Sequence, residues 1–430
     1  MPMLTLRQEL EARWLLKQYS NEALFDLYDK GGQTFYIGMD PSADSLTIGN
    51  FAMFMTCVQF LKRGNTLIFI VGGETWMIGD PGGKDSERSM QTMEQLEKNY
   101  NSIHTQVQFV MANVLEIAWI QCDRILKNNH DFYETMTFSD FLRTVGKNIT
   151  VNNMIKKETV AKRIEDPDKS ISYTEFSYML IQWYDFVRLY QDFGCRLQIC
   201  GSDQWGNGVT GLELISKMCH KDDSSDVADA YLMTSPLILD SNGKKFGKSE
   251  GNAVWLSPEK NSPYFVYQFF MNVTDVDVSR FLKVYSLLDI EEIANIQKKH
   301  DENPELRYGQ RELAYRVCQI IFGTKAAETA KEVSIFMFSD DKLELLRNAD
   351  EATKMAIAKE VWELRIQNWE MWIIDALVES GLCESRGDAK KMIEQWAVLL
   401  DEQVIKDASL IISHTYMLLQ KGKKNMRIIV

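Results

Sequence analysis

Short apolar runs alternate with helix-like segments from Thr34 to about Gly201. Residues 67–71 read LIFIV and end in two glycines, and residues 196–199 read RLQI and precede GSDQWGN. Strands of this kind, ending in glycine-rich turns before helices, are typical of a parallel sheet that binds ligands at the carboxyl ends of its strands. The pattern therefore predicts an α/β fold with a Rossmann-like parallel-sheet domain over residues 1–257.

The pattern becomes helical after about Pro258. Asp289 and Glu292 have the spacing of a capping box before a helix that runs to about His300. A further helix is expected to begin at Asn303-Pro304 and to end at Gly323.

These signals predict an α-helical domain over residues 258–338. The polar, acidic stretch 339–359 is interpreted as a linker. Residues 360–430 mix helical and strand-like segments and predict a small C-terminal α+β domain.

Composition narrows the class of protein. The chain has 430 residues, enough for two or three domains, and its net charge of -13 argues against indiscriminate nucleic-acid binding while leaving room for RNA bound through local basic patches. The chain shows neither an apolar run of about eighteen residues nor a signal peptide, so we expect a cytoplasmic protein without membrane association.

The seven cysteines are scattered and odd in number, which indicates a reducing compartment and no disulfide framework. Cys195, Cys200, Cys219 and His220 lack the spacing of paired zinc ligands, so no structural metal is expected.

The segment Asp40 to Asn50 reads DPSADSLTIGN and opens a helix expected over residues 48–63. Thr47 and Asn50 lie three residues apart on one helical face, where both can hydrogen-bond a phosphate or ribose oxygen. Plain N-capping by Thr47 or Ser45 is the alternative interpretation.

Two cationic segments complete a candidate polyphosphate site. Lys245 and Lys248 flank a glycine in KKFGKS (residues 244–249), so both can reach one pyrophosphate; a solvated charge run is the alternative. In GGETWMIGDPGGKDSER (residues 72–88), Asp80 can hold an ammonium group, and Lys84 and Arg88 add positive charge, although a simple turn also explains Asp80-Pro81-Gly82. Together these segments favour a polyphosphate nucleotide that is bound and then cleaved.

Residues 175–190 form a third candidate element, a helix. Tyr178, Gln182 and Asp185 fall on one face of it, either as a solvent-facing stripe or as the wall of a polar pocket.

In order and spacing, the chain resembles bacterial-type tyrosyl-tRNA synthetases, which are class I aminoacyl-tRNA ligases. The resemblance runs nearly from end to end and rests on the combination YIGMDPSADSL, GGETWMIGDPGGK, SERS, KNNHDF, VGKNITVNNM, ISYTEFSYMLIQWYDF, CRLQICGSDQWGN and KFGKS.

The resemblance implies a role for each matching residue. Tyrosine would be bound through its phenol hydroxyl by Tyr36 and Asp185, and through its ammonium group by Asp80, Tyr178 and Gln182, with Gln204 alongside. ATP would be bound by Asp40, Thr47, Gly49, Asn50, Gly201, Asp203, Lys245 and Lys248. The transferring phosphoryl group and the leaving pyrophosphate would be stabilised by Lys84, Arg88, Lys245, Lys248, Thr47 and Asn50.

The resemblance also implies partners. ATP would be a substrate, Mg²⁺ would accompany the pyrophosphate, and the RNA would be tRNA(Tyr). Residues 112–165, an insertion in the catalytic domain, would form much of a homodimer interface, together with the hydrophobic run FVMANVLEIAWI at 109–120. From Glu363 to Val430 there are nine basic and ten acidic residues, so the tail is nearly neutral. Its expected tRNA contacts are Arg386, Lys390, Lys391, Lys421, Lys423, Lys424 and Arg427.

Several positions depart from the family pattern. Thr47-Ile48-Gly49-Asn50 stands where the family usually has a tetrapeptide with histidine at both ends, and Trp76 and Cys200 stand where glycine is usual. In the tail, Trp396 and Asp401-Glu402 replace turn glycines. Two other functions stay open on these grounds. One is a catalytically weak RNA-binding or regulatory paralogue. The other is a ligase for a different aryl amino acid, which Tyr36 and Asp185 argue against.

Overall fold

The structure is a computed structural model of the chain. It describes residues 4–78, 92–157, 160–161, 164–166, 171–219, 229–243, 246, 248–249, 252–361, 363–364, 370–413, 416–422 and 425–430. The chain divides into two compact units. Unit 1 comprises residues 1–262 and 270–321, and unit 2 comprises residues 263–269 and 322–430.

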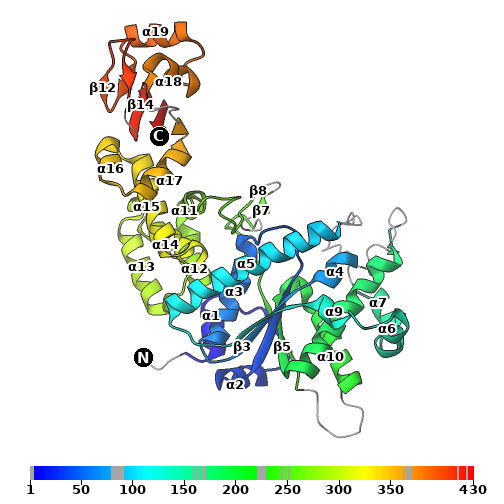
Figure 1. Cartoon of the computed structure of the whole chain (residues 1–430). Coiled ribbons are helices and arrows are strands. Elements are labelled where there is room, and N and C mark those ends of the chain that lie inside the picture. The colour runs from blue at the N-terminus through cyan, green and yellow to red at the C-terminus, as the bar shows by residue number, and fades with distance from the viewer. Residues whose placement is uncertain are drawn as a thin grey trace. The chain divides into compact units, whose positions relative to one another are not determined.

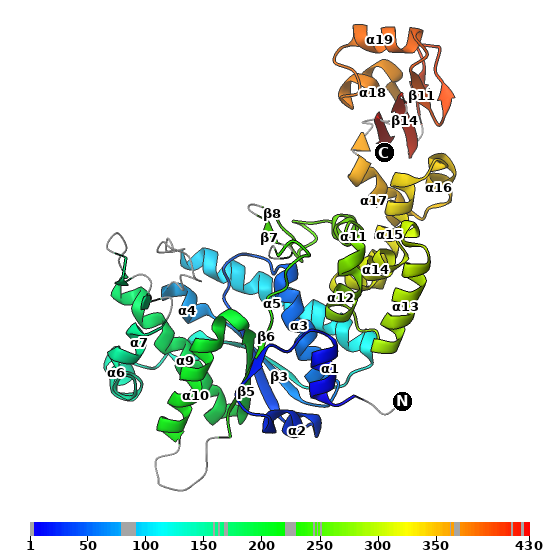
Figure 2. The same ribbon diagram turned by 180° about the vertical axis from the view of Figure 1, so that it is seen from behind.

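Unit 1 is built on a six-stranded sheet with the order β1-β6-β5-β2-β3-β4 (Figures 1 and 2). Five strands are parallel, and β1 pairs antiparallel with β6 at one edge. The strands are β1 (Gln18–Tyr19), β2 (Thr34–Met39), β3 (Thr66–Val71), β4 (Arg124–Asn128), β5 (Cys195–Gly201) and β6 (Tyr231–Ser235). The predicted strands at 67–71 and 196–199 are therefore confirmed as β3 and β5.

Helices cover both faces of this sheet. The helix α9 packs against α10 on one side, and α3 packs against the sheet with α1 on the other (Figures 1 and 2). The α-helices up to the end of the sheet are α1 (Leu6–Ala12), α2 (Ala23–Asp29), α3 (Ile48–Leu61), α4 (Gly73–Ile78), α5 (Met93–Ala118), α6 (Phe138–Thr144), α7 (Val151–Ile155), α9 (Tyr173–Phe193) and α10 (Trp205–Cys219). Short 3₁₀ helices are η1 (Asn129–Phe132), η2 (Gly146–Asn148) and η3 (Ser202–Gln204).

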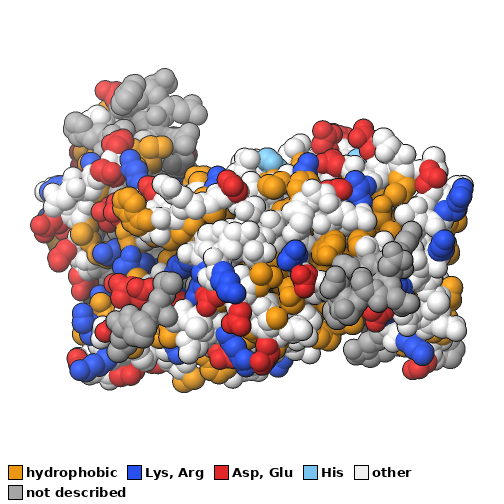
Figure 3. Space-filling view, turned by 90° about the horizontal axis from the view of Figure 1, so that it is seen from below, with side chains coloured by type: hydrophobic (Ala, Val, Ile, Leu, Met, Phe, Trp, Pro, Cys, Tyr) orange, Lys and Arg blue, Asp and Glu red, His pale blue; other side chains and the backbone are white. Residues whose placement is uncertain are grey.

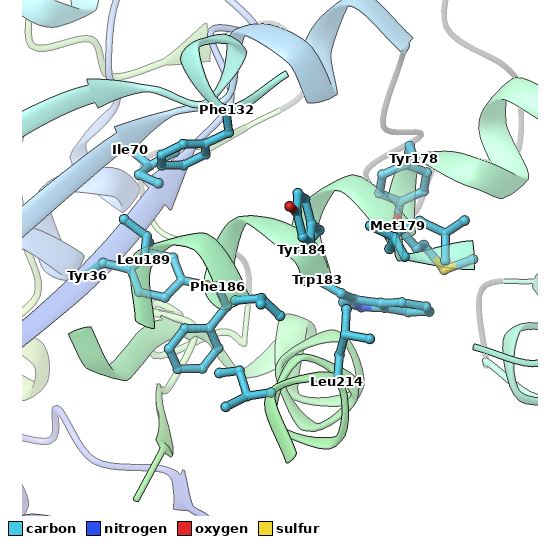
Figure 4. Packing of buried hydrophobic residues seen from close by; sticks show 14 of the residues in the cluster. Tyr36, Ile70, Phe132, Tyr178, Met179, Trp183, Tyr184, Phe186, Leu189 and Leu214 are labelled. Atoms are coloured by element: carbon cyan, nitrogen blue, oxygen red, sulfur yellow. The ribbon is translucent and has the colours of Figure 1, made fainter. Parts of the chain in front are cut away.

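The core between the sheet and α9 combines aliphatic side chains with several buried aromatic ones. Tyr36 of β2 lies beside Phe186 of α9, with ring centroids 5.1 Å apart, and Trp183 is fully buried in the same cluster (Figure 4). Leu214 of α10 closes this cluster from the other side. The packing fixes α9 along the sheet and so determines where its polar face points.

Unit 1 continues with helices α12 (Asp275–Tyr285), α13 (Ile290–Glu302) and α14 (Tyr308–Phe322). The predicted capping box of Asp289 and Glu292 is confirmed at the start of α13. The helix expected from Asn303-Pro304 is interrupted, because η4 (Pro304–Leu306) ends at Arg307, whose φ is 52°. Gly323, with φ of 89°, ends the following helix as expected.

Unit 2 combines a helical part with a small α+β part. Its sheet has five strands in the order β12-β11-β14-β15-β9, and β10 pairs with β13. The helices are α15 (Thr324–Phe338), α16 (Lys342–Asn348), α17 (Glu351–Val361), α18 (Ile373–Glu379) and α19 (Arg386–Glu394), with α11 (Pro263–Met271) lying across the division between the units. The strands are β9 (Glu363–Leu364), β10 (Met371–Trp372), β11 (Val398–Leu400), β12 (Gln403–Val404), β13 (Ile411–Ile412), β14 (Met417–Lys421) and β15 (Asn425–Ile429). The predicted order of a parallel-sheet α/β part, helices and a C-terminal α+β part is confirmed.

The stretch 339–359, expected to be a linker, instead contains most of α16 and α17. Leu346, Ile357 and Ala358 are buried in one cluster with Leu418 and Ile428 of the C-terminal sheet. A few apolar side chains suffice to anchor these helices. Because many acidic residues surround them, the helical spacing of the apolar residues was not recognised in the sequence.

The tail turns that lack glycine adopt glycine-like backbone conformations. Trp396, Asp401 and Glu402 have φ of 59°, 49° and 65°, all in the left-handed region. Asp401 and Glu402 connect β11 to β12, and the Asp401 carboxylate accepts a hydrogen bond from the backbone N–H of Leu418 at 2.8 Å. The turn geometry is thus kept without glycine, at the expense of left-handed strain.

Within the described residues, no helix is both long and apolar enough to cross a membrane. On the face shown in Figure 3, acidic and basic side chains are interspersed with hydrophobic ones. Among the described residues visible there, neither charge forms an extended patch.

Candidate active site

A cavity of about 890 Å³ opens at the carboxyl ends of β2 and β5. This is the edge of a parallel sheet at which ligands bind. Its lining contains eleven of the predicted site residues, namely Tyr36, Asp40, Thr47, Gly49, Asn50, Tyr178, Gln182, Asp185, Gly201, Asp203 and Gln204. Segments far apart in the sequence therefore meet at one site.

Other predicted site residues lie outside the described part of the chain. They are Asp80, Lys84, Arg88 and Lys245, together with the side chain of Lys248. The backbone of Lys248 belongs to β7 (Lys248–Ser249), which pairs antiparallel with β8 (Asn252–Ala253).

Asp185 is the buried carboxylate of the cavity, with 5% of its surface exposed. Its Oδ2 accepts a hydrogen bond from Asn129 Nδ2 at 3.0 Å, and its Oδ1 accepts one from the Tyr133 hydroxyl at 2.8 Å. Burial raises the pKa of Asp185 to about 7, while these two hydrogen bonds oppose the shift. The carboxyl therefore changes charge near neutral pH.

Tyr36 lines the same part of the cavity and is 3% exposed. Burial raises the pKa of its phenol well above the ordinary value, and the negative charge of Asp185 adds to the effect. A neutral phenol and a carboxyl group thus line the same part of the cavity, which is suited to a ligand hydroxyl that both donates and accepts a hydrogen bond.

The polar face of α9 is a pocket wall rather than a solvent stripe. Tyr178 is 6% exposed, and Gln182 donates through Nε2 to Gln204 Oε1 at 3.3 Å. Asn207 donates to the same Gln204 oxygen at 2.9 Å, which fixes the orientation of that amide. These side chains offer a polar rim above the buried Asp185.

Asp40 is held at the end of β2 by a neighbouring hydroxyl. Thr75 Oγ1 donates to Asp40 Oδ1 at 2.9 Å and lies 3.1 Å from the carbonyl oxygen of Gly72. A Cβ on Gly72 would collide with the Asp40 and Thr75 side chains, so a larger residue there would displace both from their present positions.

The start of α3 is capped by the residues that replace the usual histidines. Thr47 donates to Asn50 Oδ1 through its backbone N–H at 2.9 Å and through its hydroxyl at 2.8 Å. The interpretation of Thr47 as an N-capping residue of α3 is therefore supported. The cap uses the oxygen of Asn50 and does not involve the amide nitrogen, which can donate a hydrogen bond, and Asn50 also lines the cavity.

Backbone hydrogen bonds join the segment DPSADSLTIGN at the start of α3 to the chain that directly follows the KFGKS hairpin. Ile48 N–H donates to the Val254 carbonyl at 2.9 Å, and Leu256 N–H donates to the Leu46 carbonyl at 2.8 Å. The Ser257 N–H also donates to Ser45 Oγ at 3.1 Å. These contacts hold the end of the KFGKS hairpin against the N-terminus of α3.

Phe246 anchors the other side of that hairpin. It is 8% exposed, and its ring centroid lies 4.1 Å from that of Phe281 in α12. Because Phe246 also lines the cavity, the described residues on either side of this hairpin are held beside the cavity at the N-terminus of α3.

Sequence reasoning missed several residues of the site. Asn129 and Tyr133 contact Asp185, Thr75 holds Asp40, and Gln198 lines the cavity. Asn129 lies in KNNHDF, which contributed to the resemblance, but nothing in its spacing linked it to α9. Cys200, which stands in place of glycine, lines the cavity, and burial raises the pKa of its thiol.

The tail residues expected to bind RNA differ in their surroundings. Lys390 and Lys391 are exposed on α19. Arg386 forms a bidentate pair with Asp375 at 2.7 Å, and Lys421 donates to the Leu382 carbonyl at 2.8 Å. Arg427 donates to the Ser380 carbonyl at 2.9 Å. Lys423 and Lys424 lie outside the described residues.

Comparison with known proteins agrees with this geometry. Residues 29–339 match the family model of tRNA synthetases class I (W and Y). The chain is 37% identical to a tyrosine–tRNA ligase of Staphylococcus carnosus over 97% of both chains, and 38% identical to one of Chromobacterium violaceum over 99% of this chain and 98% of that one. A C-terminally truncated mitochondrial tyrosyl-tRNA synthetase of Aspergillus nidulans has a similar structure, with a TM-score of 0.71 and 28% identity over 78% of this chain and 95% of that chain.

The chain therefore belongs to the class I tRNA synthetases of the tryptophan and tyrosine group, and it is an aminoacyl-tRNA ligase. Its C-terminal part, residues 353–429, matches the tyrosine–tRNA ligase SYY-like C-terminal domain.

The raised pKa of Asp185 predicts a pH-dependent stability difference from Asp185→Asn. The folded pKa of about 7 lies above the ordinary pKa of an aspartate. The stabilisation that comes from the protonated carboxyl is therefore fully present below the unfolded pKa and is lost as pH rises through the folded pKa. Between pH 5 and pH 8 the wild type should lose about 2–3 kcal/mol relative to the variant. Urea unfolding of both proteins across this range measures the difference, and parallel pH curves would contradict it.

Proposed function

We propose that this protein is a tyrosine–tRNA ligase. The carboxylate oxygen of tyrosine attacks the α-phosphorus of ATP, the bond from that phosphorus to the pyrophosphate oxygen breaks, and tyrosyl-adenylate forms. A ribose hydroxyl at the 3′ end of tRNA(Tyr) then attacks the carbonyl carbon of the adenylate, and AMP leaves. The observation that carries the proposal is the buried Asp185 carboxylate facing Tyr36 at the inner part of a cavity that lies at the strand ends.

Tyrosine fits the inner part of the cavity in one orientation. Its phenol hydroxyl donates to Asp185 and accepts from Tyr36, while Tyr178 and Gln182 on the polar rim receive the ammonium end, with Gln204 alongside. Asp80 is proposed as a further partner of that ammonium group. This leaves the substrate carboxylate near the mouth of the cavity, where the nucleotide enters.

ATP occupies the side of the cavity nearest α3. The helix N-terminus with Gly49 and Asn50 lines that side, and partial positive charge at a helix N-terminus favours phosphate. Asp40, Gly201 and Asp203 are proposed to bind the ribose. Lys84, Arg88, Lys245 and Lys248 are proposed to stabilise the charge on the transferring phosphoryl group and the pyrophosphate.

The chemistry requires positioning and charge stabilisation rather than a general base, because the attacking carboxylate is already ionised. Mg²⁺ is proposed to enter with the pyrophosphate of ATP. The seven cysteines are free, which agrees with the reducing cytoplasm proposed for this enzyme.

A catalytically weak regulatory paralogue is the second candidate function, favoured by the missing histidines at the start of α3. The cap geometry weakens that reading, because Asn50 keeps a hydrogen-bond donor beside the cavity. A protein that binds tyrosine and ATP without forming adenylate would establish the paralogue instead.

The enzyme should strongly prefer tyrosine over phenylalanine. Phenylalanine would leave Tyr36 and Asp185 unpaired, and sites of this kind reject such an analogue by about 10⁴–10⁵, a range for which tyrosyl-tRNA synthetases are themselves the established example. Asp185→Ala should remove most of the preference. The ratio of kcat/KM for the two amino acids in ATP–pyrophosphate exchange measures it, and an unchanged ratio in the variant would refute the role of Asp185.

Asn50→Asp should slow adenylate formation. The carboxylate keeps the oxygen that caps Thr47 but removes the amide donor and adds negative charge beside the phosphates. The loss of one donor at a developing anion typically costs about 10²–10³ in rate. Pre-steady-state activation should fall while tyrosine affinity is kept. Thr47→Ser, which retains the capping hydroxyl, is the matched control, and equal rates in both variants would argue against the donor role.

The tail should contribute to tRNA binding through Lys390 and Lys391. Both are exposed on α19, so replacing both with alanine should leave the sheet of unit 2 intact. We expect a higher KM for tRNA and a salt dependence of binding that is shallower by about one unit per lost phosphate contact. Tyrosine activation without tRNA is the internal control. An unaltered salt slope would exclude phosphate contacts at these lysines.

A homodimer is proposed through the insertion 112–165. This region exposes Trp119 by 92%, Phe138 by 67% and Val151 by 58%. Phe138→Asp should therefore shift the mass measured by light scattering toward that of one chain. Phe338→Asp is the control, because Phe338 is 76% exposed but lies in unit 2. Wild-type protein that is monomeric and active at micromolar concentration would overturn the proposal.

A further inference from the structure

The contact between Tyr133 and Asp185 is not explained by the binding roles assigned above. Tyr133 directly follows η1, the 3₁₀ helix whose first residue is Asn129. Its backbone N–H donates to the His130 carbonyl at 2.9 Å, so the short helix holds Asn129 and Tyr133 in a fixed relation. Two donors from one turn therefore approach the same carboxylate, one at each oxygen.

The hydroxyl of Tyr133 has a choice of two acceptors. It lies 2.8 Å from Asp185 Oδ1 and 2.9 Å from the Ile181 carbonyl oxygen. It has a single proton, and an ionised carboxylate is the stronger acceptor, so ionisation of Asp185 draws that proton to Oδ1. Burial raises the pKa of Tyr133 well above its ordinary value, which keeps the hydroxyl protonated and able to donate.

The ring of Tyr133 is held independently of its hydroxyl. Its centroid lies 6.2 Å from that of Phe141 and 6.0 Å from that of Tyr184. Removing the oxygen alone should thus leave the ring in place, which makes Tyr133→Phe a clean probe of the hydrogen bond.

We infer that Tyr133 is a positioning residue that holds Asp185 as an ionised, oriented acceptor for the phenol hydroxyl of the substrate. The inference rests on the proposed function, since it concerns how the carboxylate recognises tyrosine. With Oδ1 bound by Tyr133 and Oδ2 by Asn129, each oxygen keeps a further lone pair, and the substrate hydroxyl is the donor that uses one of them.

Other groups around Asp185 favour its neutral form. Asp40 and Glu74 are negatively charged neighbours that raise its pKa, and Tyr36 faces it as a neutral phenol. His130 pairs with Glu74 at 2.7 Å. The two proteins compared below both retain His130 and Glu74, so these charges are the same in each.

The test is the dissociation constant for tyrosine, measured by calorimetry on the full chain between pH 6 and pH 8.5, for wild type and Tyr133→Phe. Loss of one hydrogen bond to a charged group should raise the pKa of Asp185 by about one pH unit. The variant should then bind tyrosine about fivefold more weakly than wild type at pH 7 and less than about twofold more weakly at pH 8.5. A ratio of variant to wild-type dissociation constants that is the same at every pH would overturn the inference, whether the ratio is one or larger. A purely structural effect would not follow the titration of Asp185.

Two further proteins sharpen the result. Tyr28→Phe is the matched control: it removes a buried hydroxyl that donates to the Thr34 carbonyl at 2.7 Å, and it should leave the pH profile of tyrosine affinity unchanged. In an Asp185→Asn background, Tyr133→Phe should give no pH-dependent loss, since the titrating partner is gone. A pH-dependent loss that persists there would also overturn the inference.

The same measurement separates this inference from the proposed function. Wild-type protein that binds no tyrosine at any pH would refute the function and the inference with it. Wild-type protein that binds tyrosine, with a variant ratio independent of pH, would refute the role of Tyr133 alone.

Discussion

A buried carboxylate at the inner part of the cavity is the constraint around which the site is organised. Asp185 is 5% exposed, and burial of an ionised carboxyl is unfavourable unless donors surround it. Asn129 and Tyr133 supply two of these donors. The proposed substrate supplies another through its phenol hydroxyl. Ligand recognition and the stability of the fold are therefore coupled. The Asp185 carboxyl that selects the ligand is also a group whose burial is unfavourable when no ligand is bound.

The aromatic core makes that arrangement possible. Phe186 follows Asp185 directly in α9 and packs on Tyr36 of β2, and Trp183, one turn earlier in the helix, is buried in the same cluster (Figure 4). Because these rings lock the rotation of α9, its polar residues Tyr178, Gln182 and Asp185 face the cavity. On the nucleotide side, backbone hydrogen bonds between residues 46–48 and 254–256 bring the helix N-terminus and the lysine-rich hairpin to one place.

Much of the architecture could be predicted from local patterns. The apolar run at 67–71, the capping box at Asp289 and the helix at 175–190 all depend on neighbours in sequence, and each is present. The prediction of a linker at 339–359 was wrong, because Leu346 and Ile357 in this acidic stretch are buried against a sheet formed far along the chain. The contacts of Asn129 and Tyr133 with Asp185 were not predicted for the same reason, since they join residues more than fifty positions apart. The roles of Thr47 and Asn50 could be predicted only in part, because the Asn50 side chain both takes part in the helix cap and lines the cavity.

The most direct test of the account is ATP–pyrophosphate exchange by the wild-type protein with each of the twenty amino acids in turn. Exchange should depend on tyrosine, because only its side chain presents a phenol hydroxyl to Tyr36 and Asp185. Exchange that depends on a different amino acid, or no exchange with any of them despite binding of tyrosine and ATP, would contradict it.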